Sequence, residues 1–133
     1  MSMHKFHLLG CFLVCTTLAA CASHKPTMTK LVAKDSGSTV HIREGDILEI
    51  ALEGNPTTGY TWEVAPAIGA LLVQQGEGEY KAESSALGAG GIVTLRFKAI
   101  EKGTAELKLI YHRTFEPNVP PLRTFDIKII VDK

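Results

Sequence analysis

The segment Val93-Thr-Leu-Arg-Phe-Lys-Ala99 alternates apolar and polar residues without a break. Successive side chains of a β-strand point to opposite faces of the sheet, so this spacing predicts a strand with one face in a core and the other in water. The same period of two recurs outward along the chain, at residues 48–53, 60–64, 105–111 and 125–131. This pattern is typical of antiparallel sheets that are wetted on one face.

Shorter segments near residues 31–34, 38–43 and 71–75 predict weaker strands, and no stretch shows a convincing apolar stripe of period 3.6. Seven or eight short strands separated by turn residues predict an all-β fold, an immunoglobulin-like antiparallel β-sandwich. A small β-barrel is the alternative. Whether Tyr80-Lys-Ala forms an extra strand stays open. We expect Trp62 and the inward-facing Phe and Tyr side chains in the core.

The composition is that of one globular domain. The chain has 133 residues, enough for one hydrophobic core, and 45% of them are hydrophobic, which excludes a disordered chain. Fourteen basic residues balance fourteen acidic ones. This balance argues against a nucleic-acid-binding protein, which would carry a clustered basic excess. We expect a monomer without nucleic acid among its partners.

The first twenty residues have the pattern of a lipoprotein signal peptide. After the basic start at Lys5, residues 8–20 are apolar or small and uncharged. Such a run is shorter than the roughly 20 residues of a spanning helix, but it fits the apolar core of a secretory signal. Its end, Leu18-Ala-Ala-Cys21, resembles the bacterial lipobox, which implies cleavage before Cys21 and acylation of that cysteine. An ordinary signal peptide that ends near a cysteine is the alternative.

We therefore divide the chain into a signal peptide at residues 1–20, a lipidated cysteine with a polar tether at residues 21–29, and a domain at residues 30–133. Cys21 would be the only cysteine left after cleavage, so a disulfide within the chain is excluded. The anchor predicts a cell-envelope location, with the lipid bilayer as a partner through acylated Cys21. By analogy with Gram-negative lipoproteins, Ala22-Ser23 after the cysteine favours the outer membrane.

Three longer connections, at residues 54–59, 76–91 and 112–121, carry unusual residues. If the strands reverse direction at each connection, these three gather at one end of the sandwich. The tight turns, at residues 35–38, 44–46 and 101–103, would then lie at the other end. Binding residues are commonly placed on loops that a rigid scaffold supports.

Each of the three connections carries a short motif. Asn55-Pro-Thr-Thr-Gly-Tyr60 predicts a stiff hairpin that projects the hydroxyl and methyl groups of its threonines, because proline presets φ and glycine permits a positive φ. Gly88-Ala-Gly-Gly91 predicts a mobile backbone that can approach a partner closely. Arg113-Thr-Phe115 combines two residue types that are enriched at interfaces. The alternatives are a simple turn, a slack loop, and an Arg113–Glu116 pair with Phe115 folded onto the core.

Nothing in the sequence favours catalysis or a cofactor. The chain contains neither an HExxH nor a CxxC spacing for a metal, and its serines lack the context of a nucleophile elbow. We therefore expect no enzyme, no metal site and no cofactor.

The three motifs, in this order and on three loops, resemble the chagasin family of inhibitors of papain-like cysteine peptidases, over about residues 29–133. The third motif departs from the family, which commonly has Arg-Pro-Trp. The resemblance implies a reversible, non-covalent inhibitor whose first loop enters the active-site cleft and covers the catalytic Cys–His pair, while the other two loops straddle the cleft. An envelope binding or adhesion module that uses the same loops is the alternative. The peptidase-binding residues implied are Asn55, Pro56, Thr57, Thr58, Gly59, Tyr60, Gly88, Ala89, Gly90, Gly91, Arg113, Thr114 and Phe115.

Overall fold

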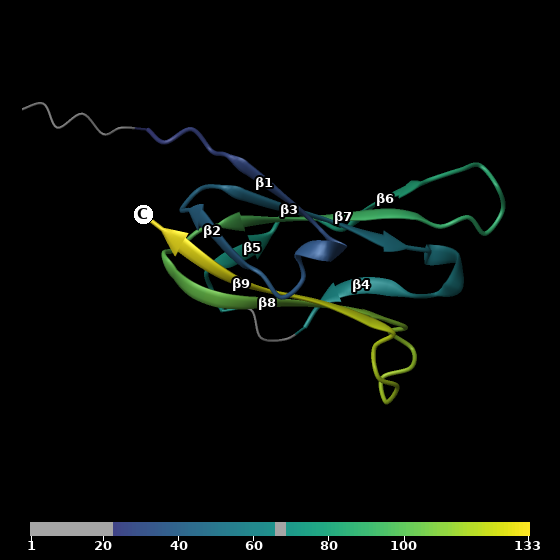
Figure 1. Ribbon diagram of the computed structural model, residues 1–133. Helices are drawn as coiled ribbons and strands as arrows, with labels where there is room; N and C mark the ends of the chain where they lie inside the picture. Colours follow the sequence, from purple (N-terminus) through teal and green to yellow (C-terminus); the bar gives the residue numbers. More distant parts are fainter. Residues whose placement is uncertain (1–22, 66–68) are drawn as a thin grey trace, which may run out of the picture.

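The computed structural model describes residues 23–65 and 69–133. The predicted signal peptide and the predicted acylation site at Cys21 lie outside the described residues. The described chain forms two β-sheets packed face to face, with the N-terminal segment and the C-terminus at the same end (Figure 1). Within residues 23–65 and 69–133, no helix is long and apolar enough to cross a membrane.

The described residues form nine strands, which make up the two sheets, and two short 3-10 turns. The first sheet has the order β1 (Met28–Val32), β3 (Ile47–Gly54), β7 (Gly91–Ala99), and both β5 (Leu72–Gln74) and β6 (Glu79–Ala82) pair with the far side of β7. The second sheet has the order β2 (Thr39–Arg43), β9 (Arg123–Asp132), β8 (Gly103–His112), β4 (Thr61–Val64). The turns are η1 (Ala33–Asp35) and η2 (Pro56–Thr58).

The predicted sandwich is confirmed, with two differences in detail. Nine strands are described instead of seven or eight, because β6 forms at the segment left open. All four residues of β6 are exposed, so the sequence shows no alternation of buried and exposed positions that would predict this strand. The sheets are also mixed, because β1 and β2 pair in parallel with β3 and β9. The chain passes from one sheet to the other between β1 and β2, so each strand joins the edge of a different sheet.

The apolar faces predicted from the period of two meet in the core. Register places Ile50 opposite Leu95 and Leu109 opposite Phe125, and all four side chains are buried. Each such side chain stabilises the fold by about 1.5–3 kcal/mol relative to an exposed position. Trp62 is 6% exposed, which confirms its predicted place in the core. Its indole N–H donates to Glu53 O at 2.9 Å and so joins the two sheets.

The described strands bring the three long connections to one end of the sandwich, on the right in Figure 1. Strands β5 and β6 are both antiparallel to β7, so β6 continues the direction of β5 and leaves this grouping intact. The turns at residues 44–46 and 100–102 lie at the opposite end, called the base here. The expectation that every tight turn lies there is wrong for residues 35–38. Gly37 N donates to Asp126 O at 2.6 Å, near the middle of β9, because β1 starts at the base beside Ile47 and ends halfway along β3, beside Ala51.

An ion-pair network on the outer face of the first sheet ties both edge strands to the centre. Glu49 of β3 lies 2.8 Å from Arg96 of β7 and 3.2 Å from Lys30 of β1. Arg96 also lies 3.0 Å from Glu79 of β6. The hydrogen bond from Arg96 lowers the pKa of Glu49 below its usual value, against the opposing effect of burial.

A buried carboxylate holds the base together. Asp46, 5% exposed, accepts hydrogen bonds from Thr27 N at 2.8 Å and Arg43 N at 2.9 Å, and His24 Nε2 lies 2.9 Å from it. Burial acts to raise the pKa of Asp46, but the Thr27 and Arg43 amides and His24 outweigh burial and lower it. Asp46 thus joins the N-terminal segment to the turn between β2 and β3.

Replacing Asp46 by alanine should lower the free energy of unfolding by about 1–3 kcal/mol at neutral pH, because the amide groups lose their acceptor. The contribution of Asp46 is fully present above its unfolded pKa, near 3.8, and is lost as the pH falls through its lower folded pKa. Asp46→Ala should therefore lose less stability than the parent chain between about pH 5 and pH 2.

Urea unfolding at several pH values measures this difference. Asp126→Ala is the matched control, because Asp126 is a half-exposed strand residue whose carboxylate lies 3.7 Å from Lys108. Parallel pH profiles for the parent chain and Asp46→Ala would contradict the assignment.

Candidate functional site

The first loop is organised around the side chain of Asn55. Asn55 Oδ1 accepts hydrogen bonds from Thr57 N at 3.2 Å and from Thr57 Oγ1 at 2.6 Å. Asn55 O accepts a third bond from Thr58 Oγ1 at 2.6 Å. Pro56 begins the 3-10 turn η2, and Gly59 ends it with φ of 79°, as the predicted stiffness requires. The loop is therefore preformed in the unbound protein.

One expectation about the first loop is wrong. The loop is not a hairpin, because β3 and β4, which it connects, belong to different sheets. The hydroxyl groups of Thr57 and Thr58 are engaged within the loop, because both donate to Asn55. The two threonines themselves remain exposed at the tip.

The loop rests on the hydroxyl group of Tyr111. Tyr111 is buried on β8, and its Oη accepts a hydrogen bond from Asn55 N at 2.8 Å. Its ring stacks on Tyr60, with centroids 5.3 Å apart, and packs against Trp62 at 5.0 Å. A core residue thus fixes the start of the loop directly.

The glycine loop is tied to the first loop. Asn55 Nδ2 donates to Gly88 O at 3.0 Å, and Tyr80 Oη donates to Ala89 O at 3.2 Å. Gly90 O accepts from Glu83 N at 3.1 Å. At Gly91 a side chain would collide with the backbone of β6, in particular with Lys81 O, so glycine is required there by close packing. These bonds show a supported loop in place of the slack one considered from sequence.

The third loop is joined to the first through Arg113. Its Nε donates to Thr58 O at 3.0 Å, and its guanidinium carbon lies 4.5 Å from the ring centroid of Tyr60. Arg113 also pairs with Glu116 at 3.5 Å, as one sequence interpretation proposed. The ring of Phe115 lies 3.1 Å from the position that a Cβ would take at Gly59, so a larger residue there would displace the ring.

Contacts between cations and aromatic rings connect this loop to the core. The Arg113 guanidinium carbon lies 5.9 Å from the ring centroid of Phe115 and 4.5 Å from that of Tyr60. Tyr60 stacks on Tyr111, and the guanidinium carbon of Arg123 lies 4.5 Å from the ring centroid of Tyr111. Each cation–π contact contributes about 0.5–1 kcal/mol at exposed positions. Sequence reasoning missed Tyr111 and Arg123, since the pattern of strand residues shows burial and not what a side chain supports.

Exposed apolar side chains surround the first loop. Phe115 is 67% exposed, so it does not fold onto the core. Leu87, at the tip of the glycine loop, is fully exposed, and Val119 and Leu122 of the third connection are also exposed. Exposed apolar groups gathered on loops are typical of interaction surfaces. Sequence analysis missed these three residues, although a leucine beside a glycine run was a usable signal.

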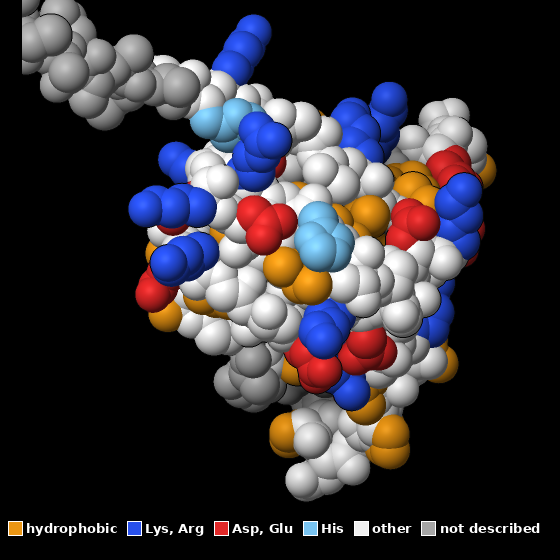
Figure 2. Space-filling model, turned by 60° about the vertical axis from the view of Figure 1, so that its left-hand side comes forward, with side chains coloured by type: hydrophobic (Ala, Val, Ile, Leu, Met, Phe, Trp, Pro, Cys, Tyr) orange, Lys and Arg blue, Asp and Glu red, His pale blue; other side chains and the backbone are white. Residues whose placement is uncertain are grey.

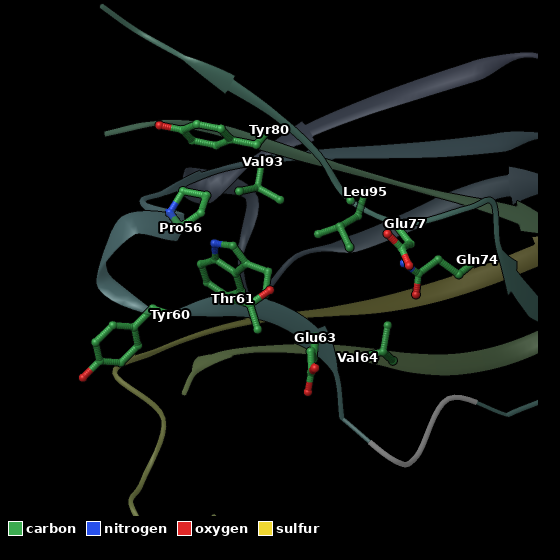
Figure 3. A pocket seen from close by; sticks show the side chains of 13 residues that line it. Pro56, Tyr60, Thr61, Glu63, Val64, Gln74, Glu77, Tyr80, Val93 and Leu95 are labelled. Atoms are coloured by element: carbon green, nitrogen blue, oxygen red, sulfur yellow. The ribbon is translucent and has the colours of Figure 1, made fainter. Parts of the chain in front are cut away.

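A groove of about 680 Å³ lies beside the loops, between the edges of the two sheets. Figure 3 shows Tyr80, Val93 and Leu95 on the wall formed by the first sheet. Thr61 and Glu63 of β4 lie on the opposite wall. The part of the chain that the structure describes contains no group of three or more His, Cys, Asp and Glu side chains arranged to hold a metal ion.

The structure therefore brings the three sequence-predicted motifs together, with different roles for their members. Asn55, Gly59, Tyr60, Gly91 and Arg113 make contacts within the site. The exposed members are Pro56, Thr57, Thr58, Gly59, Gly88, Thr114 and Phe115.

Comparisons with known proteins agree with this arrangement. The sequence model described as "Chagasin family peptidase inhibitor I42" matches residues 41–129, which include all three loops. Amoebiasin-2 of Entamoeba histolytica is 30% identical over 114 residues, 84% of this chain and 91% of that protein. Amoebiasin-1 of the same organism is 34% identical over 104 residues, 76% of this chain and 97% of that protein.

The fold is similar to a crystal structure of the cysteine protease inhibitor EhICP2 from Entamoeba histolytica. The two share a TM-score of 0.70 and 28% sequence identity, and the match covers 80% of this chain and 96% of that one.

Tyr111→Phe should loosen the first loop while the sandwich stays folded. The Asn55 amide would lose its acceptor, at a cost of about 1–2 kcal/mol in the free energy of unfolding. Hydrogen exchange at the Asn55 amide and along residues 56–59 should become faster. Tyr80→Phe is the matched control, since its hydroxyl group supports the glycine loop instead. Unchanged exchange at Asn55 in Tyr111→Phe would remove this tyrosine from the site.

Proposed function

The chain belongs to the chagasin family of peptidase inhibitors, and from this premise we propose that its three clustered loops close the active-site cleft of a papain-like cysteine peptidase. We propose that binding is reversible and non-covalent. The match to a family of peptidase inhibitors and the similarity to the cysteine protease inhibitor EhICP2 support inhibition of cysteine peptidases. The observation that carries the proposal is the pair of hydrogen bonds that join the first loop to the glycine loop and to the third loop. Asn55 Nδ2 reaches Gly88 O, and Arg113 Nε reaches Thr58 O, each at 3.0 Å.

The first loop acts as the wedge that enters the cleft. Its internal hydrogen bonds exist before binding, so little conformational entropy is lost when it docks. Residues 56–58 form a 3-10 turn, so they do not offer the peptidase an extended peptide to cleave. A preformed, non-extended wedge accounts for inhibition in place of hydrolysis.

The other two loops contact the walls of the cleft through exposed apolar side chains. Leu87 lies on one side of the wedge and Phe115 on the other, and both are available for burial. Arg113 is engaged with Thr58 and Tyr60, so its main task is to hold Phe115 beside the wedge. Thr114 is exposed and lacks the ring that would restrict φ, so this loop is less preorganised than one with Arg-Pro-Trp.

We also propose that acylation of Cys21 anchors the inhibitor in the bacterial cell envelope, in the outer membrane of a Gram-negative cell. The support for this second proposal is the lipobox-like sequence Leu18-Ala-Ala-Cys21 after an uncharged apolar run.

Replacing both Thr57 and Thr58 by arginine should weaken inhibition by about 100-fold or more, because bulky charges at the tip cannot enter the cleft. Thr104→Arg provides the matched control, since Thr104 is an exposed threonine near the base. Titration of papain activity gives the inhibition constants, and thermal melts verify folding. A folded double variant with full inhibition would refute the wedge.

Phe115→Ala should weaken binding by about 1–3 kcal/mol and lower the melting temperature only slightly, because the ring is mostly exposed in the free protein. Ile100→Ala, an exposed apolar residue at the base, should change neither quantity. Association and dissociation rates against papain measure the effect. A lower melting temperature with unaltered rates would show that Phe115 serves the fold and not the interface.

Mass spectrometry of the full chain isolated from bacterial membranes should find an N-terminal Cys21 that carries acyl chains. Cys21→Ser should move the protein to the soluble fraction. An unmodified chain that begins at another residue would exclude the anchor.

A further inference from the structure

The segment that follows the proposed anchor is fastened to the base of the sandwich. His24 lies only three residues after Cys21, and its Nε2 lies 2.9 Å from Asp46. Its Nδ1 is 3.5 Å from Arg43 Nη1. A chain covers at most about 3.6 Å per residue, so the three residues from Cys21 to His24 can span at most about 11 Å. An anchor at Cys21 would therefore be attached near the base, opposite the three loops.

The base surface has the chemistry of a membrane contact. Figure 2 shows Lys and Arg side chains gathered beside the point where the N-terminal segment meets the sandwich. Ile100, 45% exposed, lies among them in the turn between β7 and β8. The basic side chains near this end, all exposed, are Lys25, Arg43, Lys98, Lys102 and Lys133.

Acidic side chains at the base are fewer and partly engaged. Asp46 is buried under its hydrogen bonds, and Asp132 lies 3.6 Å from His41. Glu44 and Glu101 remain exposed in the two turns. The exposed surface of the base is therefore weakly positive, whereas the described chain as a whole has one acidic residue in excess.

We propose that the base is a docking surface for the anionic lipid bilayer and that the His24–Asp46 contact holds the sandwich upright on it. This inference rests on the proposed acylation of Cys21. The headgroup layer is about 5–8 Å deep on each side of the bilayer. An anchor within about 11 Å of His24 therefore leaves the base against the headgroups, where lysine and arginine are attracted to anionic lipids.

The consequence is a fixed direction for the three loops. The eight residues of β3 span about 27 Å from the base towards the first loop. The wedge therefore stands away from the bilayer and meets peptidases that arrive from the aqueous side. Without the His24 contact, the free tether would extend to Thr27, and the sandwich could tilt.

Quenching by a headgroup-labelled lipid tests this orientation. The full chain is purified from membranes and reconstituted in vesicles that contain phosphatidylglycerol. A dye is attached at Glu101→Cys in the base or at Leu87→Cys at the loop tip. We expect quenching at least fivefold stronger at position 101 than at position 87. His24→Ala should reduce that ratio to below twofold. His41→Ala is the control and should preserve the ratio, because His41 lies on the same face but outside the tether.

The outcomes separate the orientation from the anchor. Equal quenching at both positions in protein that is acylated and incorporated in the vesicles would overturn the orientation and leave the anchor intact. An unchanged ratio in His24→Ala would overturn the role of the His24–Asp46 contact. Protein that carries no acyl chain and remains outside the vesicles would overturn the proposed anchor, and the orientation with it.

Discussion

The hydroxyl group of Tyr111 is the point on which the loop surface depends. It accepts the Asn55 amide, and Asn55 in turn holds both threonines of its own loop and the carbonyl group of Gly88. The same tyrosine ring stacks on Tyr60, over which Arg113 lies. One buried side chain thus transmits the rigidity of the core to all three loops. A wedge fixed in this way loses little entropy on binding.

Much of this fold could be predicted from periodicity, because the long strands have one buried face. The pattern at residues 93–99, for example, places Leu95 and Phe97 in the core as expected. Strand β6 escaped this reasoning because none of its side chains is buried. The alternation of apolar and polar residues also does not indicate which of the two sheets a strand joins. The sequence therefore predicts a hairpin at the first loop, whereas this loop connects strands of different sheets.

The grouping of the three loops could be predicted from the sequence, but the contacts of their side chains could not. Reversal of the strands was enough to gather the three motifs at one end. The hydroxyl group of Thr57 donates to Asn55 Oδ1 and that of Thr58 donates to Asn55 O, and only the folded loop defines these contacts. Tyr111 looks like any core aromatic in the sequence, and its hydrogen bond spans 56 positions along the chain. Arg113 was expected to face a partner, yet most of its contacts are made within the site.

Hydrogen–deuterium exchange of the protein, free and saturated with papain, tests the central claim most directly, since it reports the interface without altering a residue. Our account predicts slower exchange in the complex along residues 55–60, 83–90 and 113–122, with the turns at residues 44–46 and 100–102 unchanged. Inhibition accompanied by protection of the base, and none at the three loops, would contradict it.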